Sequence, residues 1–148
     1  MPTSAAVPVP KLLLASELVA RHQLLAHGIN CTPQRLLVAQ VLFAHDQHVS
    51  ADQLLAMVRG QGARVSKATV YNTLNLFADK GLVRALRVDA ERTVFDSNTA
   101  AHYHLHDLDS GELFDVDLGE VAFSRLPTLP LGVETVGVDV IIQVRRTR

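Results

Sequence analysis

Three histidines alternate with other residues in the stretch AHYHLHD, residues 101–107. They are His102, His104 and His106, in a chain that has only seven histidines. Side chains at every second position of a β-strand project from one face, so a strand here would present three imidazoles together. Such a face can bind a metal ion, respond to pH or simply be solvated. The elements that position these residues decide between the three.

The composition describes a globular protein. The 148 residues are 48% hydrophobic and 20% charged, enough for one ordinary domain or two very small ones. No apolar run approaches the roughly 20 residues that span a bilayer, so we expect no membrane partner. The single cysteine, Cys31, excludes an internal disulfide and a structural CxxC zinc site. The first ten residues lack a basic signal-peptide region, and we expect a flexible arm over 1–10 and a cytoplasmic protein.

Charge is distributed unevenly along the chain. Residues 1–92 carry ten Lys and Arg against six Asp and Glu, whereas residues 93–148 carry four against nine. This asymmetry is typical of a basic half that meets a polyanion and an acidic half with another task.

The order of predicted elements favours an α+β fold that begins with a winged helix-turn-helix. Helical spacing and capping residues predict four helices, and alternation then predicts short strands. The helices are expected at 12–27, 34–45 after Thr32 and Pro33, 51–60 after Ser50, and 67–81 after Ser66. A hairpin is expected over 82–88 and 91–97, strands over 102–108 and 112–117, a short helix over 119–126 and a long strand over 134–148. We place the winged-helix domain at 11–95 and a second, small domain at 96–148.

The fourth predicted helix carries side chains suited to reading DNA. Lys67 can meet a phosphate, Thr69 and Tyr71 offer hydroxyls or apolar contact, and Asn72 can pair with adenine through two hydrogen bonds. Arg84 lies on the hairpin, where a wing would follow the DNA backbone. An ordinary amphipathic helix with a solvated face would look similar. The helices-then-hairpin order and the basic balance favour DNA binding.

Seven motifs occur in an order that resembles the ferric uptake regulator family of metal-dependent repressors. They are TPQR (32–35), HVSADQLL (48–55), ATVYNTL (68–74), GLV (81–83), FD (95–96), HYH (102–104) and SGELFDVD (110–117). The resemblance runs from about residue 18 onwards. It implies an N-terminal winged helix, a C-terminal α/β dimerisation domain and a homodimer on double-stranded DNA with an AT-rich palindrome. Arg35, in the first motif, joins the expected DNA-binding residues.

The resemblance also implies a metal site between the two domains. Carried over residue by residue, its ligands are His48, Asp96, His102, His104 and Asp115, with the spacing and both aspartates of the peroxide-responsive repressor branch. A mixed nitrogen and oxygen ligand set suits Fe²⁺ or Mn²⁺, and Zn²⁺ in vitro. An ion held by both domains would fix their angle and so space two recognition helices about 34 Å apart, one DNA turn.

Two departures from the family pattern leave a second hypothesis open. The CxxC pairs that usually hold a structural zinc are absent, and Ser110 stands where a cysteine is expected. In addition, no histidine follows His106, so the additional C-terminal metal site of some members cannot be assembled. Members without these cysteines resemble the iron response regulator branch, which senses haem or iron status. Tyr103 interrupts the histidine run of that branch, and Cys31 is followed by Thr32 rather than by proline.

We therefore expect a metal-responsive repressor of iron, manganese or peroxide-stress genes, and no enzyme. The alternative is a regulator that binds DNA without metal and is released by metal or haem. A remote alternative is a non-haem iron enzyme with a two-histidine, one-carboxylate triad. If the iron form reacts with peroxide, oxidation of His48 or His102 would release DNA.

Other expectations concern packing. We expect His106 at the surface and Cys31 half-buried. Without a zinc clamp, the second domain must be held by strand pairing and a dimer interface. Its expected buried set is Leu105, Leu113, Phe114, Val116, Val138, Val140, Ile141 and Ile142.

Overall fold

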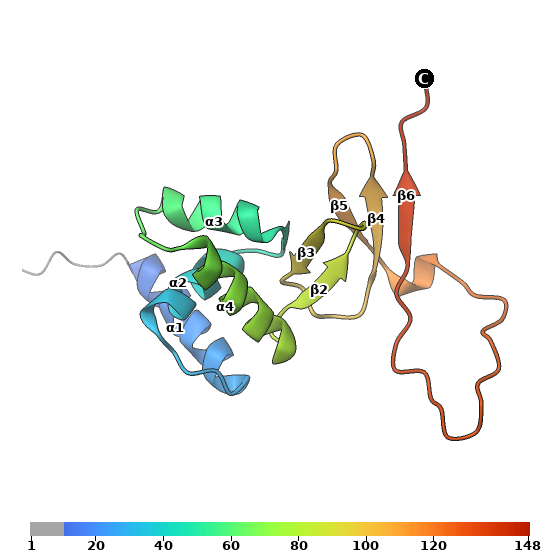
Figure 1. The fold of residues 1–148 in the computed structure, drawn as a ribbon, viewed down its shortest axis with the longest axis horizontal. Helices are drawn as coiled ribbons and strands as arrows, with labels where there is room; N and C mark the ends of the chain where they lie inside the picture. Colours follow the sequence, from blue (N-terminus) through green and yellow to red (C-terminus); the bar gives the residue numbers. More distant parts are fainter. Residues whose placement is uncertain (1–10) are drawn as a thin grey trace, which may run out of the picture. The chain divides into compact units, whose positions relative to one another are not determined.

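The computed structural model describes residues 11–148, with side chains from residue 16 onwards, and its ribbon is drawn in Figure 1. The expected arm at 1–10 lies outside the described residues. The chain divides into two compact units, the first ending at Thr99 and the second running from Ala100 to Arg148. Helices and strands occur in both units taken together, which confirms the α+β class.

The first unit contains four helices and a small sheet. The helices are α1 (Lys11–Ala26), α2 (Pro33–Leu42), α3 (Ala51–Gly60) and α4 (Lys67–Asp79). The strands are β1 (His48–Val49), β2 (Arg84–Arg87) and β3 (Thr93–Asp96), ordered β1-β3-β2 with antiparallel neighbours. The β2–β3 hairpin follows α4 directly, and this is the wing (Figure 1).

Side-chain caps start three of these helices where the sequence predicted them. The hydroxyl of Thr32 accepts a hydrogen bond from the backbone N–H of Arg35, with Pro33 in the first turn of α2. Ser50 and Gln53 form a reciprocal capping box at the start of α3. Ser66 accepts from the N–H of Thr69 at the start of α4. These caps satisfy backbone donors that a helix leaves without an internal partner.

One apolar core holds the first unit together. Its largest fully buried side chains are contributed by all four helices, and they are Leu24, Val38, Leu42, Leu54, Val58, Val70, Leu74 and Phe77. Because α4 turns its apolar stripe inwards, its opposite face stays in solvent with Tyr71 and Asn72.

The second unit is a three-stranded sheet. Its strands are β4 (Tyr103–Asp107), β5 (Leu113–Val116) and β6 (Ile141–Val144), ordered β5-β4-β6, and a short 3₁₀ turn η1 spans Leu118–Glu120. β5 pairs with β4 antiparallel, and β6 pairs with β4 parallel. β5 returns the chain to the starting end of β4, and residues 117–140 then lead from β5 to β6 on the other side of β4, so that β6 runs parallel to β4.

One predicted element of this unit was wrong, and another was predicted too long. The helix expected over 119–126 is only the 3₁₀ turn at Leu118–Glu120, and Pro127 and Pro130 follow in an extended stretch. The strand expected over 134–148 is only Ile141–Val144, because its register partners on β4 are the four residues from His104 to Asp107. A strand extends only as far as it has a partner to bond.

Most of the expected buried set of the second unit is not buried within the single chain, and its burial in a dimer interface stays a prediction. Of its eight residues only Val116 is buried, while Phe114, Val138 and Ile142 are exposed. The side chains of Leu105, Phe114 and Ile142 stand at paired register positions, so they share one face of the sheet. That face has no complete cover within the described chain.

None of the helices in residues 11–148 has the length and apolar character needed to cross a bilayer.

The core predicts a clear difference between two leucines. Replacing the fully buried Leu74 with alanine removes packed methyl groups and leaves a cavity, so we expect the free energy of unfolding to fall by about 3 kcal/mol. The same change at Leu18, which is 65% exposed, should alter it by less than about 0.5 kcal/mol. Urea denaturation at equal protein concentrations measures both. Equal effects would contradict this account of the core.

Candidate metal centre and nucleic-acid surface

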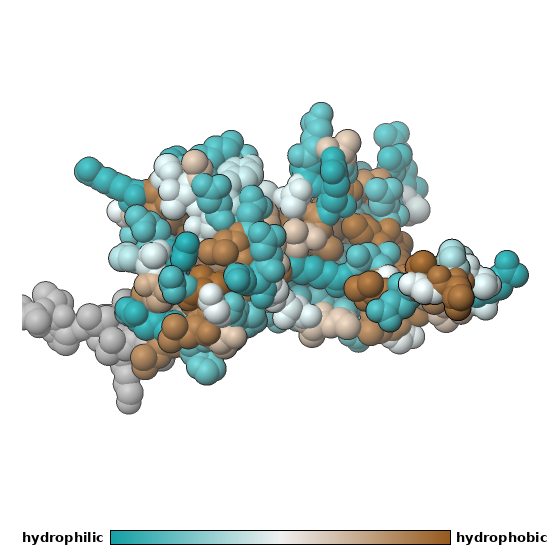
Figure 2. Space-filling view, turned by 60° about the horizontal axis from the view of Figure 1, so that its bottom comes forward, coloured by the Kyte–Doolittle hydropathy of each residue, from teal (hydrophilic) through white to brown (hydrophobic). Residues whose placement is uncertain are grey.

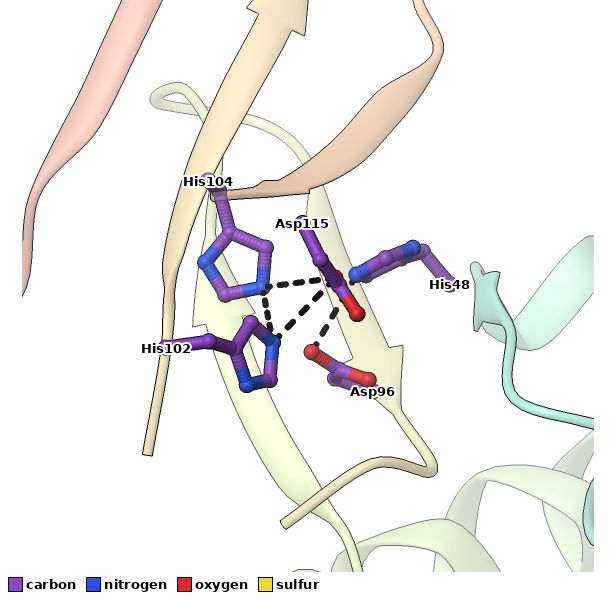
Figure 3. Close-up of side chains that lie close together, drawn as sticks. All are labelled: His48, Asp96, His102, His104 and Asp115. Atoms are coloured by element: carbon purple, nitrogen blue, oxygen red, sulfur yellow. Dashed lines mark hydrogen bonds and ion pairs between the residues drawn. The ribbon is translucent and has the colours of Figure 1, made fainter. Parts of the chain in front are cut away.

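A histidine and an aspartate lie opposite each other in the first unit. The antiparallel pairing of β1 with β3 sets His48 against Asp96, and His48 Nε2 is 3.2 Å from Asp96 Oδ2. The Asp96 carboxylate is fully buried, and its Oδ1 accepts a hydrogen bond of 2.9 Å from the backbone N–H of Asn98. Burying a carboxylate is costly unless a cation or donors compensate it, so this pair is suited to a metal ion. Figure 3 shows the two side chains.

A second group of ligand atoms lies on the sheet of the second unit. His104 and Asp115 are register partners on β4 and β5, and His102 precedes β4 on the same face as His104. The two Nε2 atoms of His102 and His104 are 3.0 Å apart, and the Asp115 Oδ1 atom is 3.3 Å from His102 Nε2 and 4.0 Å from His104 Nε2. Figure 3 shows the three side chains converging. Both rings are buried, at 7% and 2% exposed.

A backbone contact orients one of these rings. His102 Nδ1 is hydrogen-bonded to the carbonyl oxygen of Ala100, and a carbonyl can only accept. Nδ1 therefore carries the proton, and in the neutral ring Nε2 keeps its lone pair on the side of His104 and Asp115. Metal-binding histidines characteristically use one ring nitrogen for the ion and the other for such an oxygen acceptor.

The structure thus places the five predicted ligands in two groups, each within one unit. His48 and Asp96 form one group, and His102, His104 and Asp115 form the other. Imidazole nitrogens and carboxylate oxygens without a thiolate are the ligands of Fe²⁺, Mn²⁺ and Zn²⁺. Both groups therefore fit the metals that the sequence predicted.

The prediction for His106 was wrong. Its side chain is 3% exposed rather than at the surface. It lies on β4 two residues after His104, so strand alternation puts both on the same buried face. Cys31 is half-buried, as predicted.

The predicted DNA-binding residues gather on α4 and the start of α2. Thr69 and Asn72 of α4 line a groove of about 300 Å³ with Arg35 and two neighbours at the start of α2, Thr32 and Gln34. The exposed Tyr71 lies beside them on α4, and Arg84 lies on the wing strand β2. The groove holds hydroxyl, amide and guanidinium groups, which are the groups that meet base edges and phosphates.

Lys67 is held by neighbours at the start of α4. Its Nζ lies 3.1 Å from Asp52 Oδ1 of α3 and 5.6 Å from the centroid of the Tyr71 ring. The hydrogen bond to Asp52 raises the pKa of Lys67 above its usual value, so the amine stays charged. The ion pair of Asp52 with Lys67 was not predicted from the sequence, because the two residues lie on different helices.

The tip of the wing is a stable turn. The Asp89 carboxylate accepts hydrogen bonds from the backbone N–H groups of Glu91 and Arg92 and from the Arg92 guanidinium. The Glu91 bond, and then the Arg92 side chain, lower the pKa of Asp89 below its usual value. The predicted hairpin at Asp89-Ala90 is confirmed.

Four helices followed by an antiparallel hairpin define a winged helix-turn-helix, and the second unit adds a sheet on which three of the predicted metal ligands lie together. The model of the ferric uptake regulator family matches residues 26–138. The chain belongs to this family.

Relatives and solved structures agree with that assignment. Peroxide-responsive repressors PerR of Staphylococcus aureus and Staphylococcus epidermidis are 34% and 33% identical over 88 residues, 60% of this chain. The match spans only about 60% of the length of these relatives. The ferric uptake regulator of Pseudomonas aeruginosa with manganese has a TM-score of 0.68 and 27% identity, covering 88% of this chain and 99% of that one. The ferric uptake regulator of Vibrio cholerae has a TM-score of 0.67 and 27% identity, covering 85% and 98%.

Proposed function

We propose that this chain is a metal-responsive transcriptional repressor that binds DNA as a homodimer in the cytoplasm. The observation that carries the proposal is the convergence of His102, His104 and Asp115 in a chain that also exposes a polar recognition groove. The regulated genes would serve iron or manganese uptake or the response to peroxide. Family membership favours a regulator over the non-haem iron enzyme that the same two histidines and a carboxylate would otherwise suggest.

DNA binding would use the groove between α2 and α4. Asn72 and Thr69 would contact base edges, and Arg35 and Lys67 would contact phosphates. Arg84 would follow the backbone from the wing. A dimer reads two half-sites related by a twofold axis, so the operator would be a palindrome, and we propose that it is AT-rich.

We propose that all five ligands hold a single ion. Only five residues, 97–101, separate Asp96 from His102, so the two groups cannot be more than about 20 Å apart along an extended chain. The His48–Asp96 pair offers two ligands and the other group three, and neither alone completes a six-coordinate site. Bound metal would supply positive charge that links the two ligand groups and favours one arrangement of the winged helix.

The metal-bound dimer would bind DNA more tightly than the metal-free dimer if metal sets the distance between its two recognition helices to that between the operator half-sites. A tenfold tightening requires about 1.4 kcal/mol of coupling. The alternative, release of DNA by metal or haem, predicts the opposite sign. The relatives and structures described above are named for peroxide response, ferric uptake and manganese, and none of these names includes haem.

A second copy of the chain would cover the open face of the second unit. Phe114 and Ile142 are 48% and 39% exposed on one face of the sheet. The connection of residues 117–140 also exposes large apolar side chains, namely Leu118, Phe123, Leu126, Leu129, Leu131, Val133, Val136 and Val138. Figure 2 shows apolar surface, in brown, at the right of the view. Exposed apolar surface of this extent is typical of a protein interface.

DNA affinity tests the function directly. We expect fluorescence anisotropy on the chain's own upstream DNA, under anaerobic conditions at fixed salt, to show at least tenfold tighter binding with Fe²⁺ or Mn²⁺ than without. Asn72→Ala should weaken the metal form by about tenfold, since it removes contacts to one base. Binding that metal weakens would support the alternative instead, and no binding in either state would refute the proposal.

Metal affinity tests the ligand assignment with two neighbouring histidines. We expect His104→Ala to weaken Mn²⁺ binding by at least about tenfold, because it removes a proposed ligand. His106→Ala is the matched control, since this residue is equally buried on the same strand but is not a proposed ligand. Isothermal titration measures both. Equal losses in the two variants would indicate a general effect on the sheet.

The oligomeric state tests the proposed interface. Sedimentation equilibrium should show a dimer for the wild type and a shift towards monomer for Ile142→Glu, because a buried carboxylate without a partner is costly. Gln143→Glu is the control, since Gln143 is exposed and lies on the opposite face of β6. A monomeric wild type at micromolar concentration would contradict the homodimer.

A further inference from the structure

Gln47 lies next to the proposed metal ligand His48 and reaches back to α2. Its side-chain amide Nε2 donates to the carbonyl oxygens of Val41, at 2.9 Å, and Leu42, at 2.8 Å. These two residues form the last turn of α2, which ends at Leu42 without a glycine cap. Carbonyls at a helix C-terminus have no partner within the helix, so the glutamine amide supplies the cap.

The backbone of Gln47 is bonded to Ser97, the residue after the ligand Asp96. The N–H of Gln47 donates to Ser97 Oγ at 3.0 Å, and the N–H of Ser97 donates to the carbonyl of Gln47 at 3.1 Å. The two residues are 50 positions apart in sequence. Gln47 and Ser97 extend the β1–β3 pairing by one residue pair beyond His48 and Asp96. Their hydrogen bonds therefore hold together the two strands that carry these proposed ligands.

These contacts connect the ligand pair to the DNA-binding groove through one helix. α2 is ten residues long, about 15 Å, so its two ends are joined by an unbroken ladder of helical hydrogen bonds. Gln47 bonds its C-terminal end, while Thr32, Gln34 and Arg35 at its N-terminal end line the groove with α4. A displacement of His48 and Asp96 would therefore be passed to the groove.

We propose that Gln47 is a positioning residue that couples metal binding at His48 and Asp96 to the helix-turn-helix. This inference rests on the proposed function, because it names how metal occupancy reaches the DNA surface. The side-chain amide of Gln47 bonds the C-terminal end of α2 and not a proposed metal ligand, so its effect on the ion would be indirect. Its role is to fix the position of the C-terminal end of α2 relative to β1 and β3.

The experiment compares the ratio of DNA dissociation constants without and with Mn²⁺ across matched variants. Gln47→Met keeps the length of the side chain and its neutral charge but removes the donor, and we expect the ratio to fall by about threefold to tenfold. Gln61→Met is the control, because Gln61 is exposed beyond α3 and makes no side-chain bond to α2. The DNA is a duplex selected from a random pool by the wild-type protein with Mn²⁺.

Two further readouts separate positioning from general damage. The Mn²⁺ affinity of the DNA-free Gln47→Met variant should stay within about twofold of wild type, whereas linkage requires its Mn²⁺ affinity on DNA to fall by the same factor as the ratio. Ser97→Ala removes the hydroxyl that accepts from Gln47 and should lower the ratio in the same direction. Ser97→Thr keeps a hydroxyl and should restore it.

The outcomes are distinct. A wild-type ratio near one would refute the proposed function and, with it, this inference. A wild-type ratio above ten that is unchanged in Gln47→Met and Ser97→Ala would refute the role of Gln47 alone, as would a loss of Mn²⁺ affinity in the DNA-free variant. If Gln47→Met does not fold, the Ser97 variants decide the question by the same ratio.

Discussion

The antiparallel pairing of β1 with β3 is the constraint on which the rest of the first unit's chemistry depends. Two residues of β1 are enough to bring His48 opposite Asp96, which lies at the end of the wing. β1 is followed directly by Ser50, which caps α3, and its pairing with β3 adds the third strand to the sheet. Burying the Asp96 carboxylate costs free energy unless donors or a cation compensate it, and the fold places this carboxylate opposite the imidazole of His48.

The second unit also brings its proposed ligand side chains together, but by strand pairing within one sheet. Two of its proposed ligands, His104 and Asp115, come from neighbouring strands, and the hydrogen-bonded register of β4 and β5 sets them opposite each other. The sheet has only three strands and one open apolar face. The structure thus separates two tasks, because one face of β4 carries the histidines and the other carries Tyr103 and Leu105.

Sequence reasoning succeeded where the signal is local. Thr32, Ser50 and Ser66 each sit one residue before an apolar helical pattern, and each proved to be a cap. It failed where the answer depends on residues far along the chain. β1 has two residues and no periodicity of its own, and the buried position of His106 follows from packing around β4. The apolar residues of 119–126 suggested a helix that the prolines and the missing cover do not support.

The family motifs supplied the proposed ligand residues, but no pattern in the sequence identified Gln47. Its importance lies in bonds to α2 and to Ser97, and a glutamine in a loop is ordinary in composition. Residues of this kind are found only once the strands and helix ends are placed in space.

The short connection of residues 97–101 also sets the effective concentration of one proposed ligand group in the neighbourhood of the other. On the proposal that both ligand groups hold one ion, an ion bound to one group would meet the other group at a local concentration in the millimolar range, as is typical of a short linker. Each ligand group could then bind the metal weakly by itself while the two together bind it strongly. The metal affinity would therefore depend on the length of the connection between them. Lengthening the connection would weaken metal binding without altering a single ligand.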